Sequence, residues 1–278
     1  MAAATVEGVV AVRRLEAHDE AALDELLEQD RLVNLFLRGF LASQAMDRGW
    51  WYGAEIGGRL QGVVLLLPNR LCVPWAPDPE VAAELGVWLA RRHRPTMMVG
   101  PRDAVDVIWS EWGESFTPRR FYNQRLYTLR DPQPGPSIPG FRPARSHEWP
   151  LLASRSARME WEDLGRDPAQ EDPELHNRTV RERIQSGKTW VMDHNGEVVF
   201  QINLGTRTPE GCQVGGTYVP PHHRRQGFAT LGMQAFVRTL SKSCPVITLH
   251  VNEANTAAVR CYERVGFERA APYRLLTV

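Results

Sequence analysis

The sequence predicts an α/β fold arranged in two domains. Strand-like and helix-like segments alternate along both halves of the chain, which is the pattern of helices packed on a sheet. The 278 residues are more than one small core requires. Residues 130–140 contain four prolines and two glycines, which continue neither a helix nor a sheet. We therefore expect domains at residues 1–130 and 141–278, joined by a linker at 131–140.

Charge and cysteine usage narrow the function classes. The 33 basic and 33 acidic residues cancel, so no net charge attracts nucleic acid or an anionic membrane. The four cysteines lack CxxC spacing, which indicates free thiols in a reducing compartment rather than disulfides or a zinc site. The apolar run at the N-terminus is short for export, and no stretch is long enough to span a bilayer. A soluble, cytoplasmic protein is predicted, with no nucleic-acid or membrane partner, and its oligomeric state is left open.

Local patterns place the elements of the second half in order. Asp-Pro-Glu at 172–174 suits the positive end of a helix, and glycines at 165, 187 and 266 suit helix ends. His-Asn-Gly at 194–196 is typical of a hairpin turn. The expected order is a strand at 140–145, helices at 148–165 and 172–187, a hairpin at 188–208, a strand at 211–219, a helix at 227–240, a strand at 245–251, a helix at 255–266 and a strand at 273–278.

The first half repeats this order. A strand and two helices are expected within 9–41, a hairpin turning at Gly57–Gly58 within 50–68, a helix at 79–94, a strand at 95–101, a helix at 104–113 and a strand at 125–129.

The segment YVPPHHRRQGFATLGMQAF, residues 218–236, concentrates positive charge before an apolar helix. It is either a solvated loop or a cradle for a phosphate, because a helix N-terminus presents unpaired N–H groups and partial positive charge. Arg224, Gly227 and Ala229 follow the spacing Arg-x-x-Gly-x-Ala, which is neither GxxxxGK[ST] nor GxGxxG.

This loop and the later segment VNEANTAAVRCYERVGF together resemble the GNAT superfamily of acyl-CoA-dependent N-acetyltransferases over residues 141–278. The resemblance implies a mostly antiparallel mixed sheet flanked by helices, with acetyl-CoA between two central strands that splay apart. It implies no metal cofactor. The implied cofactor-binding residues are Thr217, Tyr218 and Val219 for the pantetheine, then Arg224, Arg225, Gln226, Gly227, Phe228, Ala229 and Thr230 for the pyrophosphate, with Asn255 and Tyr262 beside the cofactor arm.

Catalytic roles follow from the same resemblance. Tyr262 is the expected general acid for the CoA thiolate, or else a core tyrosine, and Asn255 either caps its helix, contacts the cofactor, or does both. Many relatives carry a glutamate on the strand before the loop, but residues 212–217 have no carboxylate. Glu160, Glu162 and Asp163 are the candidates that remain for the base; Glu162 is chosen, although an ordinary solvated helix end is the alternative.

Three histidines are assigned no catalytic role. His222 and His223 are adjacent, so we do not expect them to converge on one metal. We assign them to a solvated loop with some phosphate contact. His250 is expected to be a hydrogen-bonded sheet histidine, with a position facing the cleft as the alternative.

The first half lacks the loop signature, so it is interpreted as a degenerate GNAT-like domain in tandem, as in proteins similar to mycothiol synthase; an unrelated α/β domain is the alternative. The predicted function is transfer of an acetyl group from acetyl-CoA to a primary amine of a small molecule, peptide or protein, by direct attack in a ternary complex. The alternative is a non-catalytic acyl-CoA-binding regulatory module.

Overall fold

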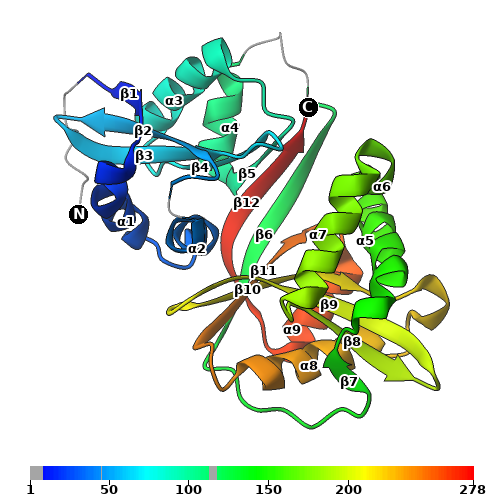
Figure 1. Ribbon diagram of the computed structural model, residues 1–278. Coiled ribbons are helices and arrows are strands. Elements are labelled where there is room, and N and C mark those ends of the chain that lie inside the picture. The colour runs from blue at the N-terminus through cyan, green and yellow to red at the C-terminus, as the bar shows by residue number, and fades with distance from the viewer. Residues whose placement is uncertain (1–8, 45, 113–117) are drawn as a thin grey trace. The chain divides into compact units, whose positions relative to one another are not determined.

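The computed structural model describes residues 9–44, 46–112 and 118–278 (Figure 1). The chain divides into two compact units. The first comprises the chain up to Leu126 together with Asn252–Ala254 and Ala270–Val278, and the second comprises Tyr127–Val251 with Asn255–Arg269. The compact units therefore differ from the proposed sequence domains, because the last strand of the chain is packed into the first unit.

The first unit contains two helices before a hairpin, followed by a helix between two parallel strands. Its sheet has the order β1-β2-β3-β4-β5-β12-β6, in which β4 and β5 are parallel. The elements are β1 (Ala11–Arg14), η1 (Ala17–Asp19), α1 (Glu20–Glu28), α2 (Leu35–Gln44), β2 (Trp50–Ile56), β3 (Arg59–Leu66), β4 (Leu71–Trp75), α3 (Pro79–Arg92), β5 (Met97–Pro101), α4 (Arg102–Ser110), the first part of β6 (Arg120–Arg130) and most of β12 (Glu268–Thr277).

The second unit repeats that order, and its sheet runs β6-β11-β10-β9-β8-β7. Here β10 and β11 are the parallel neighbours. The elements are β7 (Phe141–Pro143), η3 (Ser146–Glu148), α5 (Trp149–Leu164), α6 (Pro168–Glu171), α7 (Pro173–Gln185), β8 (Thr189–His194), β9 (Glu197–Thr208), β10 (Gly211–Tyr218), η4 (Pro221–His223), α8 (Phe228–Leu240), β11 (Val246–Asn252) and α9 (Thr256–Val265).

Both faces of the second sheet are covered, so each strand buries side chains on two sides. Val180 and Ile184 of α7 pack with Val191 and Val198 on one face. On the other face Phe200 packs in the cluster that includes buried residues of α8. Figure 1 shows α5, α6 and α7 on one side of these strands and α8 on the other. A sheet buried on both faces leaves its strand ends as the place for a site.

The sequence located most elements, but it missed β4. Pro74 has no backbone N–H to donate, and proline is unusual inside a sheet. In the structure Pro74 pairs with Val64 on the β3 side, whereas the parallel register with β5 involves only Leu71↔Met97 and Cys72↔Met98. The proline therefore lies where β4 leaves its parallel neighbour. The short helix α6 was missed as well.

Within the described part of the chain, no helix combines the length and the apolar character needed to cross a membrane.

The last strand contributes to the core of the first unit. Leu276 is fully buried in the same cluster as Val81 and Leu85 of α3, and it pairs with Met98 of β5. The hydroxyl of Tyr273 donates to the carbonyl of Val33 at 2.7 Å, and Arg274 forms an ion pair with Asp106.

We expect Leu276→Ala to destabilise the first unit by about 2–5 kcal/mol, because it leaves a cavity in a packed core. Val278→Ala, at a partly buried position of the same cluster, is the control and should cost less. Hydrogen exchange measured by mass spectrometry would check this. Amides of α3 should lose protection in the Leu276 variant, and loss confined to α8 would show that the strand supports the other unit.

Candidate functional site

The site begins where two parallel strands stop pairing. The register between β10 and β11 consists of Cys212↔Ile247 and Gln213↔Thr248, although β10 continues to Tyr218 and β11 to Asn252. After Gln213 on β10 and Thr248 on β11, the two strands no longer pair with each other, so the backbone N–H and C=O groups on their facing edges lack a partner in this pairing. An extended ligand that carries amide groups can satisfy such strand edges.

A bulge bends β10 away at this point. Its pairing with β9 shifts between Gly215 and Tyr218. Gly216 has φ +65°, a backbone conformation that favours glycine, and a Cβ there would displace the side-chain amide nitrogen of Asn203, 2.2 Å away. The sequence-predicted residues Thr217, Tyr218 and Val219 follow directly and form the end of the strand that lines the opening.

The predicted phosphate loop connects this strand end to α8. Gly227 is the N-cap of α8 with φ +87°, and a Cβ built on it would meet no atom within 4 Å. The first intrahelical bond is donated by Leu231 to the Gly227 carbonyl, which leaves the N–H groups of Phe228, Ala229 and Thr230 without an intrahelical acceptor. Glycine has no side chain to cap them, so this helix end has the geometry of an anion site.

The loop arginines have different surroundings. Arg224 donates to the Val219 carbonyl at 3.0 Å and to Glu162 at 2.6 Å, so it ties the loop to the end of α5. Arg225 is exposed, has φ +63°, and has no hydrogen-bond or ion-pair partner among the described residues. Gln226 donates to the His222 carbonyl at 3.1 Å. Arg225 is therefore the loop cation available to a ligand.

Asn255 and Tyr262 both lie at α9, which follows β11. The Asn255 side chain caps α9 by accepting from the Ala258 N–H at 3.1 Å, and its amide nitrogen lies 3.5 Å from an Asp163 carboxylate oxygen. The helix-capping role considered from sequence is thus present. Tyr262 is buried in the main core cluster. Burial raises the pKa of Tyr262 to about 12, against a smaller lowering by a hydrogen bond with Thr217. Its hydroxyl therefore stays protonated at neutral pH.

The three candidate carboxylates at the end of α5 differ in charge environment. Burial raises the pKa of Glu160. Partial burial also acts to raise the pKa of Glu162, but hydrogen bonds from Arg158 and Arg224 outweigh it and the pKa is lowered. Burial and the neighbouring Glu162 charge raise the pKa of Asp163, despite the opposing contact with Asn255. The charge of Asp163 also acts on Tyr262, which places these two groups in one neighbourhood.

The corresponding helix of the first unit has the opposite charge at its N-terminus. Helix α3 lies between the parallel strands β4 and β5, as α8 lies between β10 and β11. Its N-cap is Asp78, whose carboxylate accepts from the Glu80 N–H at 2.8 Å, and Glu80 adds a second carboxylate in the first turn. These carboxylates occupy a capping position and repel a phosphate.

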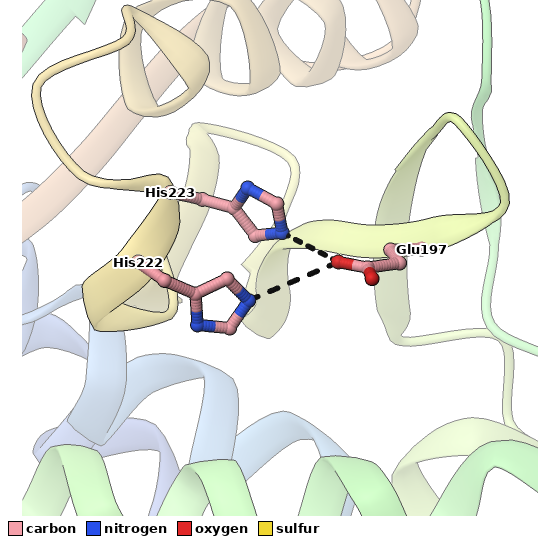
Figure 2. Close-up of side chains that lie close together, drawn as sticks. All are labelled: Glu197, His222 and His223. Atoms are coloured by element: carbon pink, nitrogen blue, oxygen red, sulfur yellow. Dashed lines mark hydrogen bonds and ion pairs between the residues drawn. The ribbon is translucent and has the colours of Figure 1, made fainter.

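His222 and His223, which were not expected to converge on one metal, lie close to the same carboxylate. Both side chains direct a ring nitrogen at the Glu197 carboxylate, at 3.8 Å from His222 Nε2 and 2.8 Å from His223 Nε2 (Figure 2). The reason is tertiary, since Glu197 lies at the start of β9, far from the histidines in sequence. His250 has the hydrogen-bonded position expected, 3.3 Å from the Gln213 side-chain nitrogen, and burial lowers its pKa to about 4.

Comparison of the sequence with known protein families identifies the same part of the chain. The sequence profile described as "Acetyltransferase (GNAT) family" matches residues 152–267. The second unit contains a GNAT-family domain. The matched segment includes the β10–β11 opening, the loop and Tyr262, and no curated protein matches the chain.

Solved structures extend the fold likeness over both halves. A tandem GNAT protein from the clavulanic acid biosynthesis pathway is 16% identical, with a TM-score of 0.59 over 97% of this chain and 98% of its own. A GCN5-related N-acetyltransferase from Sphaerobacter thermophilus is 15% identical, with a TM-score of 0.64 over 96% of this chain and 94% of its own. A GNAT-family acetyltransferase from Colwellia psychrerythraea is 12% identical, with a TM-score of 0.58 over 96% and 99%. The chain thus has a tandem GNAT fold, in which the first half also fits a GNAT-like unit.

The carboxylates beside the loop of the GNAT domain should affect stability in opposite directions. The pKa of Glu162 is lower in the folded protein than in the unfolded chain, so the ionised carboxylate stabilises the fold at a pH above its unfolded pKa. This stabilisation is lost as the pH falls through the pKa of the folded state. A raised pKa means that ionised Asp163 destabilises the fold at neutral pH, and that this cost disappears in acid.

At pH 7 we therefore expect Glu162→Gln to lower Tm and Asp163→Asn to raise it, each by roughly 1–4 °C. Near pH 3, below the ordinary carboxyl range, both differences should shrink. Thermal unfolding at the two pH values checks this. Shifts of the same sign at pH 7 would contradict the assignment.

Proposed function

We propose that the second unit binds acetyl-CoA and transfers its acetyl group to a primary amine. The observation that carries the proposal is the uncapped, glycine-headed N-terminus of α8 at the mouth of the β10–β11 opening. In this proposal the pantetheine lies along Thr217–Val219, and the pyrophosphate accepts from the N–H groups at Phe228, Ala229 and Thr230. The family profile over residues 152–267 supports an acetyltransferase of this kind.

The two arginines of the loop have different roles in this proposal. Arg225, exposed and unpaired among the described residues, supplies a charge-assisted donor to the phosphates. Arg224 keeps the loop in place through Glu162 and the Val219 carbonyl. Glu162, chosen from sequence as the base, is then a positioning residue, because two arginines stabilise its ionised form and weaken it as a proton acceptor.

Asp163 is the better proton acceptor. Its raised pKa makes it the stronger base of the two, and it lies beside Asn255 and within electrostatic reach of Tyr262. The amine nitrogen attacks the thioester carbon, and the carbon–sulfur bond breaks. The proton lost by the amine passes to Asp163, directly or through water, and the departing thiolate takes the Tyr262 hydroxyl proton. A donor and an acceptor with separated pKa values thus occupy one site.

The acceptor belongs to the broad class of primary amines of small molecules, peptides or proteins. The first unit, with carboxylates at its helix N-terminus, is proposed to have no acyl-CoA site. We propose that the protein acts in the cytoplasm, because all four of its cysteines are free thiols.

Two substitutions at one glycine test the cradle. Gly227→Ala and Gly227→Asp both place a side chain at φ +87°, so both should lose about 1 kcal/mol or somewhat more of stability. Only Asp adds a negative charge to the phosphate site. CoA affinity, measured by calorimetry, should fall at least about tenfold further in the Asp variant than in the Ala variant, since 1.4 kcal/mol of repulsion is enough. Equal affinities in the two variants would place the phosphates elsewhere.

Substitution of Tyr262 separates catalysis from binding. Tyr262→Phe keeps the ring and removes the proton donor, so turnover should fall by about 10²–10⁴-fold. Acetyl-CoA affinity should change little, because the donor acts as charge develops on sulfur. Steady-state rates with an amine panel, with thiol release as the signal, check this. Full kcat in the variant, or acetyl-CoA binding by the parent without turnover of any amine, would favour the non-catalytic binding module.

A further inference from the structure

A compact cluster of metal-ligand side chains lies just before the phosphate loop. It consists of Glu197, His222 and His223, whose nearest ligand atoms all lie within 4.8 Å of one another. Figure 2 shows that the two imidazoles come from one turn and meet a carboxylate from a different segment. Two imidazoles and a carboxylate are a ligand set that Zn²⁺ uses, with the fourth position open to water.

The distances are close to those that a tetrahedral ion needs. Zn²⁺ with bonds of about 2.0–2.1 Å holds neighbouring ligand atoms about 3.3 Å apart. The carboxylate oxygen of Glu197 lies 2.8 Å from His223 Nε2 and 3.8 Å from His222 Nε2, on either side of that value. The ligand atoms, all within 4.8 Å of one another, must therefore move closer together on the His222 side to bind one ion.

The backbone on both sides of the cluster is restricted. Pro220 and Pro221 lead into η4, and proline fixes φ at both positions. Glu197 is the first residue of β9, opposite His194, after a two-residue turn in which Asn195 and Gly196 have φ +50° and +82°. A tight turn on one side and two prolines on the other hold the ligand residues near each other before any ion binds, so little ordering is left to oppose binding.

The surroundings select among cations. The Glu197 carboxylate is exposed, and its charge reaches the half-buried Arg155 of α5, whose positive charge opposes a second cation. Mg²⁺ and Ca²⁺ bind through several oxygen ligands, and this cluster offers one carboxylate beside a competing arginine. An ion that bonds strongly to imidazole nitrogen overcomes this opposition better, and Zn²⁺, Cu²⁺ and Ni²⁺ do so.

We propose that Glu197, His222 and His223 form a surface binding site for Zn²⁺ or a similar divalent transition metal. The bound ion links the β8–β9 hairpin to η4. Because His223 directly precedes Arg224, this link restrains the residues that lead into the loop at 224–230. The site is independent of the proposed acetyl transfer, since none of its three ligands belongs to the proposed acyl-CoA contacts or catalytic groups.

The test is Zn²⁺ binding to the purified full-length chain without CoA. After removal of metals with EDTA and dialysis, calorimetric titration with ZnCl₂ should give one Zn²⁺ per chain. Glu197→Gln, His222→Ala and His223→Ala should each weaken binding at least about tenfold, because loss of groups that only support a ligand already costs that much. His147→Ala, at an exposed histidine of the same unit, is the matched control and should bind as the parent does.

Thermal unfolding provides the second measurement. Zn²⁺ should raise Tm of the parent and of the His147 variant but not of the His223 variant, because only a ligand of the folded state stabilises it. Equal Tm values of all variants in EDTA establish that the substitutions leave the fold intact. The proposal is overturned if the parent takes up no Zn²⁺, or if the three ligand variants bind it as tightly as the control. CoA binding, measured separately in EDTA, tests the proposed function, and neither outcome of the Zn²⁺ titration decides it.

Discussion

The divergence of β10 from β11 is the constraint on which the site depends. Two parallel strands that pair over only two residue pairs leave backbone N–H and C=O groups facing a gap, and such groups need partners. A bulge between Gly215 and Tyr218, with Gly216 at a positive φ, accompanies the divergence. The helices that follow the two strands carry the remaining candidate residues, Gly227 at the N-cap of α8 and Tyr262 in α9, where Tyr262 is hydrogen-bonded to Thr217 at the end of β10.

The two halves share a fold but differ in the capping of one helix N-terminus, where an anion could bind. In both, a helix starts after a strand that has just left its parallel neighbour. In the first unit the Asp78 carboxylate accepts from one of the first N–H groups of the helix, that of Glu80. In the second unit glycine occupies the N-cap and leaves those groups open. The difference is one of local capping and charge rather than of architecture, and it is the reason why we propose a cofactor loop in the second unit alone.

The neighbouring carboxylates at the end of α5 have pKa values shifted in opposite directions because their partners differ. Glu162 faces two arginines and remains ionised, whereas Asp163 is more buried, faces an amide, and is next to a like charge. Tyr262 is buried and within electrostatic reach of Asp163, and it keeps its proton because burial raises its pKa. The pairing of Arg224 with Glu162 thus does two things at once: it anchors the loop, and it leaves Asp163 as the carboxylate with the greater affinity for a proton.

The sequence by itself determined the order of elements, the glycine-headed loop before α8 and the capping asparagine of α9. These are local matters, since turns, caps and amphipathic helices are decided by residues a few positions apart. Only the tertiary structure decided that β12 completes the first unit, that Pro74 ends a parallel pairing rather than a strand, and that Glu162, rather than Asp163, is paired with Arg158 and Arg224. It also brought Glu197 to His222 and His223. Each of these depends on groups far apart along the chain, whose burial and mutual distance set their pairing and pKa values, and no local pattern encodes such distances.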